Sequence, residues 1–252
     1  MSEYLVLVAN SSDINSRTRY LFTSRSGGES APPFDEKNLA LHVGEQADAV
    51  NENRKALASS FGIDPAQLFF MNQIHGTTIL EIDSASDANE IRECDGLITS
   101  QTGLGLAVLV ADCAPVLLST SQKVAAIHVG WRGLFGGIVE KVLDLLLAND
   151  EASALNVKIG PTICGKCYEV GEDLATQAKA HGFILGERGG KPTLDIPRSV
   201  LEIVRSRLAR EKIIAGWNGS WNGICAYESS EHYSFRREKV TGRQAGVIVR
   251  ES

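Results

Sequence analysis

Residues 103–136 limit the fold of this chain more than any other part of its sequence. They contain three short apolar runs, at 106–110, 116–119 and 124–129, each bounded by glycine, proline or polar residues. Apolar runs of about four to eight residues with such boundaries are typical of buried β-strands. The polar tetrad at 120–123 predicts a turn between the second and third runs. The chain is therefore expected to fold around a buried β-hairpin.

Cys113 and His128 lie near the open end of this predicted hairpin. If the chain turns at Thr120-Ser121, Cys113 lies directly opposite His128. Directly opposed residues have Cβ atoms ~4.5–5.5 Å apart, so this thiol and imidazole can share a metal ion or a proton. A small buried cysteine beside a hydrogen-bonded histidine is the alternative. We favour a chemical role because Asp112 and a Gly-Trp-Arg-Gly turn at 130–133 flank the pair.

His75 is a candidate for a third ligand. It lies in the segment Gln73-Ile74-His75-Gly76, between strand-like runs at 68–72 and 77–82. A lone histidine at such a bend is more often a surface residue, but one cysteine and two histidines together form a plausible zinc set. Catalytic zinc takes three protein ligands and leaves one position for water or substrate. Copper is the chemical alternative for these donors.

The remaining cysteines do not indicate a disulfide framework. Five cysteines in 252 residues are few, and an odd number fits a reducing cytosol. Cys164 and Cys167 form a Cys-x-x-Cys pair in a glycine-rich loop at 160–167. A closed metal site there would need two more ligands, with only Cys94 and Cys225 left as thiols. We therefore expect Cys164 and Cys167 to be ordinary loop cysteines.

Composition and length indicate a globular protein without a membrane segment. The net charge of −6 gives no indication of nucleic-acid binding. The apolar run at 4–9 is too short for a signal peptide or a membrane span, and no basic segment precedes it. We expect a soluble cytoplasmic protein that folds as one domain over residues 1–252.

Strands and helices are mixed along the chain without strict βαβ alternation. This order favours the α+β class, with mixed β-sheets packed against flanking helices in a single domain. The segment at 81–95 is acidic, and we expect it to be exposed. Besides the runs described above, strands are expected at 4–8, 19–23, 155–159, 213–215 and 245–249, and helices at 48–61, 136–148, 173–181 and 197–211.

Several arginines lie in or beside glycine-rich or polar segments, where a planar guanidinium could bind phosphate. They are Arg25, Arg54, Arg132, Arg236 and Arg237. Arg54 lies near the apolar stripe of the helix predicted at 48–61. From the residues alone, it is a surface arginine whose stem covers apolar side chains.

Short motifs spread over nearly the whole chain carry a family resemblance. The sequence resembles the YfiH-type family, called polyphenol oxidase or laccase-domain proteins and now purine nucleoside phosphorylases. The motif pair Ala-Asp-Cys at 111–113 and His-x-Gly-Trp-x-Gly at 128–133 is the most specific part of this resemblance. The other matching segments are TSR at 23–25, NL at 38–39, NR at 53–54, QIHG at 73–76, GPTI at 160–163, YEV at 168–170, SFRR at 234–237 and TGR at 241–243.

The resemblance implies a fold, a metal and a set of reactions. The fold is a single α+β domain similar to the catalytic domain of cytotoxic necrotizing factor. The metal is zinc, with Cu²⁺ as the alternative, and the reactions are phosphorolysis of adenosine, inosine, guanosine and S-methyl-5′-thioadenosine, together with adenosine deamination. The partners implied are purine nucleosides and phosphate, for a monomer or weak homo-oligomer without nucleic acid or membrane.

The resemblance also implies roles for individual residues of this chain. They are metal ligation by His75, Cys113 and His128, catalysis by Cys113, His128, Arg54 and Arg236, and substrate binding by Arg25, Asn38, Gln73 and Arg54.

Three alternatives to this assignment stay open at the level of sequence. The older family name implies a copper-dependent polyphenol oxidase. A Cys/His hydrolase or deamidase would use Cys113 as nucleophile and His128 as base, without a metal. A zinc- or copper-binding module acting through a partner would bind metal and catalyse nothing.

Overall fold

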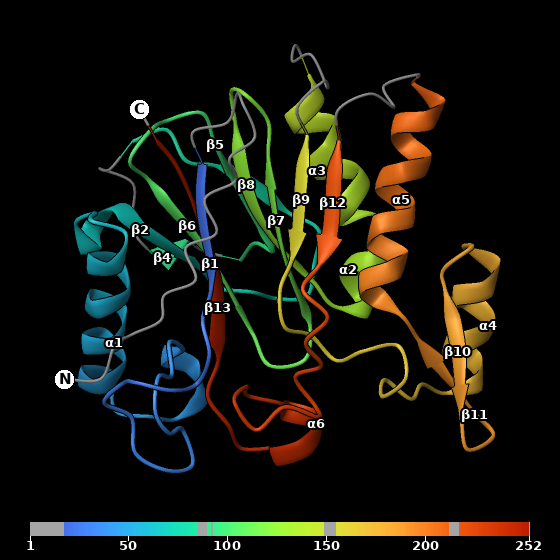
Figure 1. Cartoon of the computed structure of the whole chain (residues 1–252), viewed down its shortest axis with the longest axis horizontal. Coiled ribbons are helices and arrows are strands. Elements are labelled where there is room, and N and C mark those ends of the chain that lie inside the picture. Colours follow the sequence, from blue (N-terminus) through green and yellow to red (C-terminus); the bar gives the residue numbers. More distant parts are fainter. Residues whose placement is uncertain (1–17, 85–89, 92, 149–154, 212–216, 252) are drawn as a thin grey trace.

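Two mixed β-sheets lie face to face, and helices cover the outer face of each (Figure 1). This computed structural model describes residues 18–84, 90–91, 93–148, 155–211 and 217–251. Within these residues one sheet has five strands in the order β1-β13-β6-β2-β4, and the other has six in the order β12-β9-β7-β8-β5-β3. The α+β class predicted from the sequence is confirmed.

The strands and helices have the following bounds. The first sheet comprises β1 (Thr18–Phe22), β2 (Leu68–Met71), β4 (Glu90–Ile91), β6 (Gly105–Val110) and β13 (Gln244–Arg250); the second comprises β3 (Ile79–Glu81), β5 (Gly96–Thr99), β7 (Ala114–Ser119), β8 (Val124–Val129), β9 (Asn156–Ile159) and β12 (Asn218–Trp221). A separate hairpin joins β10 (Leu185–Arg188) and β11 (Lys191–Leu194), and the helices are α1 (Ala47–Ser60), α2 (Trp131–Phe135), α3 (Ile138–Leu147), α4 (Glu172–Ala180), α5 (Ile196–Arg210) and α6 (Phe235–Glu238), with 3-10 turns at Leu41–Val43 and Pro65–Gln67.

The core between the two sheets contains side chains from both. Phe69 and Leu106 of the first sheet are fully buried in this core. Leu97 and Leu117 of the second sheet are also buried there, with at most 1% of their surface exposed. Every residue of β6, β7 and β8 is buried, because these strands have packed side chains on both faces. Strands covered on both faces are apolar along their whole length, which explains the continuous apolar runs in the sequence.

The helices bury one apolar stripe each against the outer faces of the sheets. Helix α1 contributes Leu57 to a cluster with residues of β2, β6 and β13. On the other side, α3 and α5 contribute Val142, Leu146 and Val200 to the largest cluster, which includes residues of β7, β8 and β9. Among the described residues, none of the helices has the length and apolar character that crossing a bilayer requires.

Most elements predicted from the sequence are confirmed within a few residues at each end. They are the strands β1, β2, β3, β6, β7, β8, β9 and β13 and the helices α1, α3, α4 and α5. The strands predicted at 4–8 and 213–215 lie outside the described residues. Strands β4, β5, β10, β11 and β12 and the short helices α2 and α6 were not predicted. Helix α2 begins at Trp131, so the Gly-Trp-Arg-Gly segment starts a helix and is not a simple turn.

The β7–β8 hairpin has a longer turn than the sequence predicts. Ser119 pairs with Val124, and Pro115 pairs with His128, so the prediction that Cys113 lies directly opposite His128 was wrong. Thr120 causes the difference, because its hydroxyl accepts hydrogen bonds from the backbone N–H groups of Gln122 and Lys123 and so spans a four-residue turn. The observed pairing differs from the expected one by two residues. Because side chains alternate between the two faces of a strand, each side chain still lies on the face of the sheet that was expected.

Candidate metal centre

His75, Cys113 and His128 meet at one end of the two sheets. One ligand atom from each lies within 4.8 Å of the others. His128 belongs to β8, Cys113 immediately precedes β7, and His75 lies in the loop between β2 and β3. The Sγ of Cys113 is 4.0 Å from Nε2 of His75, and the two imidazole rings are 4.7 Å apart at their centroids. His128 is buried and His75 is exposed, so the group opens to solvent on the His75 side.

Asp95 fixes both histidines, although the sequence did not single it out. Its Oδ1 accepts a hydrogen bond of 2.8 Å from Nδ1 of His128, which directs the other ring nitrogen of His128 away from the carboxylate. The same carboxylate accepts the backbone N–H groups of Ile74, His75 and Gly76, at 3.2, 3.0 and 2.6 Å. These bonds hold His75 in a left-handed conformation with φ of 60°. Asp95 therefore orients two of the three candidate ligands.

Asp95 also corrects an expectation, because the acidic segment at 81–95 was expected to be exposed. Asp95 ends that segment and has no exposed surface. Burial raises the pKa of its carboxyl, but hydrogen bonds from His128 and from the backbone of Gly76 outweigh burial and leave the pKa below its ordinary value. Asp95 is thus a buried carboxylate. The signal available in the sequence was its position directly before the apolar run that becomes β5.

Cys113 and His128 each change the pKa of the other. Burial raises the pKa of the Cys113 thiol, but the positive charge of His128 outweighs burial and lowers the pKa to about 6. Burial lowers the pKa of His128, but Cys113 and Asp95 together raise it to about 9. Cys113 is therefore a thiolate near neutral pH. The thiolate is the form of cysteine that binds metals and acts as a nucleophile.

Asp112 anchors the backbone next to Cys113. It has a φ of 99°, a conformation that is uncommon for a residue with a side chain. Its carboxylate accepts bonds from the Ser234 hydroxyl at 2.7 Å and the Arg236 backbone at 2.6 Å. Its carbonyl accepts from the Thr162 hydroxyl at 2.7 Å. Asp112 therefore joins three chain segments at the position that determines where the Cys113 thiol lies.

Arg236 lies beside this anchor. Its guanidinium lies 5.1 Å from the centroid of the Tyr168 ring, and its Nη1 donates to the Glu169 carbonyl at 3.2 Å. Burial raises the pKa of Tyr168 to about 12, and the negative charge of Cys113 adds to this effect. Arg236 is thus joined through its backbone to Asp112, the residue before Cys113, and its guanidinium packs against Tyr168.

The residues expected to bind substrate make the following contacts. Arg25 forms ion pairs with Asp35 at 3.2 Å and Glu238 at 2.9 Å. Asn38 is fully buried, and its amide bonds the Ala40 backbone and Glu45. Arg25 is thus bound to Asp35 and to α6, and Asn38 to the segment that precedes α1.

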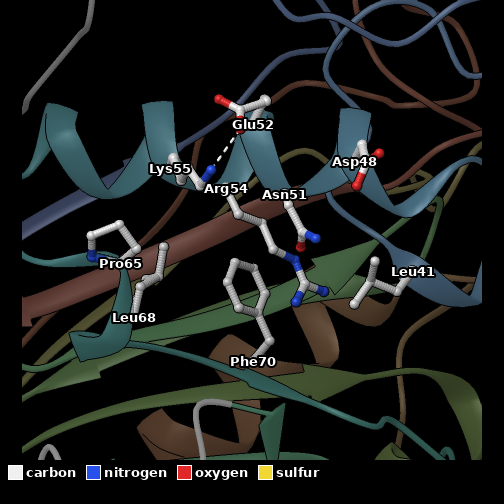
Figure 2. Close-up of a pocket in the computed structure, with 9 residues that line it drawn as sticks. All are labelled: Leu41, Asp48, Asn51, Glu52, Arg54, Lys55, Pro65, Leu68 and Phe70. Carbon is white, nitrogen blue, oxygen red and sulfur yellow. Dashed lines mark hydrogen bonds and ion pairs between the residues drawn. The ribbon is translucent and has the colours of Figure 1, made fainter.

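Gln73 and Arg54 contact neighbouring strands. The amide of Gln73 donates to the carbonyl of Leu109 at 2.7 Å and accepts from its N–H at 2.8 Å. Arg54 lies 3.8 Å from the ring centroid of Phe70, and its Nε donates to the Leu39 carbonyl at 2.9 Å. Figure 2 shows its guanidinium reaching from α1 toward Phe70 and Leu41. Arg54 lines a hollow of about 390 Å³, whose other lining residues are Leu41, Asp48, Asn51, Glu52, Lys55, Pro65, Leu68 and Phe70.

The donor set of His75, Cys113 and His128 fits a metal ion. One thiolate and two imidazole nitrogens are donors that zinc takes in proteins, and copper accepts them as well. Asp95 occupies Nδ1 of His128 and so leaves its Nε2 for a ligand. A carboxylate that orients a ligating histidine in this way is common at zinc sites. Three protein donors with an exposed side correspond to an open site and not a closed one.

Comparison with known proteins gives matches that cover nearly the whole chain. A family model described as multi-copper polyphenol oxidoreductase laccase matches residues 19–251. A purine nucleoside phosphorylase of Streptomyces coelicolor is 37% identical, over 90% of this chain and 93% of its own. Another, from Corynebacterium glutamicum, is 38% identical over 93% of this chain and 95% of its own.

Solved structures show the same fold. YlmD from Geobacillus stearothermophilus has a TM-score of 0.84 and 26% identity, covering 100% of this chain and 98% of its own. A YfiH protein of Bacillus licheniformis has a TM-score of 0.79 and 26% identity, with 93% of both chains covered.

Proposed function

This chain belongs to the multi-copper polyphenol oxidoreductase laccase family, and we propose that it is a zinc-dependent purine nucleoside phosphorylase. Its substrates are adenosine, inosine, guanosine and S-methyl-5′-thioadenosine, with phosphate as co-substrate. A second activity of the same site deaminates adenosine. The relatives named as purine nucleoside phosphorylases align with nearly their whole length, which supports this reaction class.

One observation carries the proposal: the open group of His75, Cys113 and His128, with Asp95 orienting both histidines. These three residues would hold the zinc ion. Bound zinc would supply Lewis-acid chemistry: it would polarise an oxygen atom of the substrate or lower the pKa of a water molecule to near neutral. Asp95 keeps the Nε2 of His128 directed at the site, and the exposed side at His75 leaves access for a nucleoside.

Phosphorolysis also needs a group that binds an anion. In this reaction a phosphate oxygen bonds to C1′ of the ribose while the C1′–N9 bond breaks, and the departing purine takes up a proton. We assign phosphate binding to Arg236, because a guanidinium can hold two phosphate oxygens at once. This one lies beside Tyr168, and the backbone N–H of Arg236 is bonded to Asp112, the residue before Cys113. Arg54 is the second candidate, because it lines the hollow at α1.

The proposal is tested by assaying purified protein for metal content and for both activities. We expect zinc in the protein, release of free base from inosine and adenosine that depends on phosphate, and formation of inosine from adenosine. Cys113→Ala removes one ligand of three without removing a large apolar volume, so it should abolish zinc binding at the group of His75, Cys113 and His128, and with it base release, while the protein stays folded. Cys94→Ala, which removes a buried thiol that belongs to neither group of candidate ligands, is the matched control. Base release by Cys113→Ala at the wild-type rate would overturn the proposal.

A second function follows from the charge state of the Cys113–His128 pair. A thiolate with a pKa of about 6 beside a protonated histidine suits a Cys/His hydrolase or deamidase that works without metal. Turnover by zinc-free protein that alkylation of Cys113 stops would support this function. Oxidation of phenols that appears only with added copper would support the oxidase named in the family description.

A further inference from the structure

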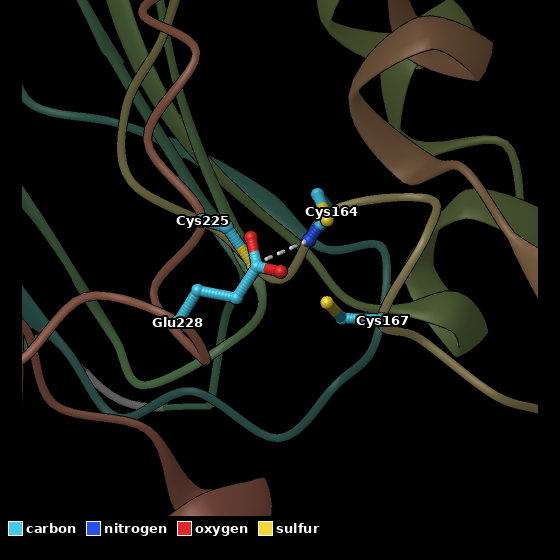
Figure 3. A group of neighbouring side chains, drawn as sticks. All are labelled: Cys164, Cys167, Cys225 and Glu228. Atoms are coloured by element: carbon cyan, nitrogen blue, oxygen red, sulfur yellow. Dashed lines mark hydrogen bonds between the residues drawn. The ribbon is translucent and has the colours of Figure 1, made fainter.

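A second group of donor side chains lies where the chain leaves β9 and β12. Ligand atoms of Cys164, Cys167, Cys225 and Glu228 all lie within 4.8 Å of one another. The three cysteines are buried, and Glu228 is exposed. Figure 3 shows the sulfur atoms and the carboxylate directed toward a common point. The sequence led us to expect ordinary loop cysteines, because a closed site needed two more ligands. The fold supplies both, as Cys225 and Glu228.

The topology of the sheet brings these segments together. Strands β9 and β12 are parallel neighbours, so their carboxyl ends lie at the same edge. The pairing continues beyond the strands as a parallel bridge between Thr162 and Cys225. In this bridge the Thr162 N–H donates to the Ile224 carbonyl at 3.2 Å, and the Ala226 N–H donates to the Thr162 carbonyl at 3.0 Å. Backbone hydrogen bonds therefore hold the two segments that carry the four donors side by side.

Each segment presents its two donors from a tight turn with the same spacing. In Cys164-Gly-Lys-Cys167, the N–H of Cys167 donates to the carbonyl of Cys164 at 2.9 Å. In Cys225-Ala-Tyr-Glu228, the N–H of Glu228 donates to the carbonyl of Cys225 at 3.2 Å. The N–H of Cys164 also donates to the sulfur of Cys225 at 3.4 Å, which links the two turns. Two residues between paired ligands is the spacing of many structural zinc sites.

We propose that Cys164, Cys167, Cys225 and Glu228 bind a structural zinc ion, in a closed site separate from the one formed by His75, Cys113 and His128. Zinc–sulfur bonds of ~2.3 Å in a tetrahedron place sulfur atoms about 3.8 Å apart. The donors already lie within 4.8 Å of one another, so shifts of about 1 Å complete the site. Three thiolates and one carboxylate fill all four positions, which leaves none for a substrate. This inference does not depend on the proposed function.

The metal would clamp the two loops that support Arg236. The first loop, which contains Cys164 and Cys167, continues directly into Tyr168 and Glu169, both of which contact Arg236. The second loop contains Cys225, and its carbonyls at Ala226 and Tyr227 accept hydrogen bonds from Arg237. Joining the loops would therefore fix the backbone on both sides of this arginine pair.

The test is the number of zinc ions bound per chain. Protein purified under reducing, oxygen-free conditions is saturated with zinc, passed over a desalting column and analysed by mass spectrometry for metals. We expect two zinc ions per chain for the wild type and one each for Cys164→Ser, Cys167→Ser and Cys113→Ala. Cys94→Ala is the matched control and should keep both ions. A wild type that binds one ion, lost in Cys113→Ala and kept in Cys164→Ser, would overturn the inference.

Two further measurements keep the inference testable if a cysteine variant fails to fold. Glu228→Gln changes an exposed side chain, so it should fold normally and lose one of its two zinc ions to a chelator faster than the wild type does. In the wild type, Cys164, Cys167 and Cys225 should react with iodoacetamide only after zinc is removed. Two results would overturn the inference. One is a Cys164–Cys167 disulfide that persists in protein purified under reducing, oxygen-free conditions, and the other is alkylation of all three thiols at the same rate with and without zinc.

Discussion

Replacing Asp95 with asparagine tests how the candidate metal centre is oriented. The asparagine can keep one oxygen facing His128 and the His75 backbone, where Oδ1 of Asp95 lies. Its NH₂ group then faces the backbone N–H groups of Ile74 and Gly76, which donate to Oδ2 in the wild type. Two donors would lose their acceptor. Each such loss costs about 1–3 kcal/mol when buried.

Because this loop is partly exposed, the lower half of that range applies. We expect Asp95→Asn to lower the free energy of unfolding by about 2–4 kcal/mol, measured by urea titration of zinc-free protein. Loss of a carboxylate that orients a ligating histidine should also weaken zinc binding about 10–100-fold, measured by competition with a chelating dye. Glu81→Gln, an exposed change in the same acidic segment, is the control and should alter neither value. A folded Asp95→Asn protein that binds zinc as tightly as the wild type would refute the role given to Asp95.

Two other changes test the charged residues around the site. Arg236→Lys keeps the charge but removes the guanidinium, so it should raise the KM for phosphate about tenfold or more while adenosine deamination changes less. If Arg54→Lys gives this result and Arg236→Lys does not, phosphate binds in the hollow at α1. Burial raises the pKa of Glu238, but hydrogen bonds from Thr241, Arg237 and Arg25 outweigh burial and leave the pKa below its ordinary value of 4.5. Glu238 therefore stabilises the fold above pH 4.5, and this contribution is lost as the pH falls through the lowered pKa. In urea titrations from pH 7 to about 3, the free energy of unfolding should fall less for Glu238→Gln than for the wild type.

The elements that the sequence predicts well are those whose side chains have one clear environment. The runs that become β6, β7 and β8 are buried on both faces, so their continuous apolar character identified them without knowledge of their neighbours. Helix α3 was equally clear, because its apolar positions form one stripe. Strand β12, with the sequence Asn-Gly-Ser-Trp, is partly exposed and was missed. Its formation depends on the edge of β9, which local sequence does not describe.

The convergence of the three candidate ligands was predicted through a partly wrong geometry. His75, Cys113 and His128 do converge, but the register that brings Cys113 near His128 depends on the hydroxyl of Thr120. Asp95 was overlooked because its partners are backbone N–H groups of another loop, which have no sequence signature. The donors Cys225 and Glu228 were not joined to Cys164 and Cys167 for a related reason. Their proximity comes from the parallel pairing of β9 and β12, which only the fold supplies.

Two hydrogen bonds join the side-chain amide of Gln73 to the backbone of Leu109, so the amide hydrogen of Leu109 can report the motion of a loop. Strand β2 ends at Met71, and beyond it the side-chain amide of Gln73 occupies the place that a peptide group would take beside β6. The amide hydrogen of Leu109 is therefore protected from exchange with solvent by a side chain of the loop that carries His75. Its exchange rate follows the opening of that loop, whereas protons bonded between strands exchange only when the sheet itself opens. A slower exchange at Leu109 on adding zinc would measure how strongly the metal orders the His75 loop.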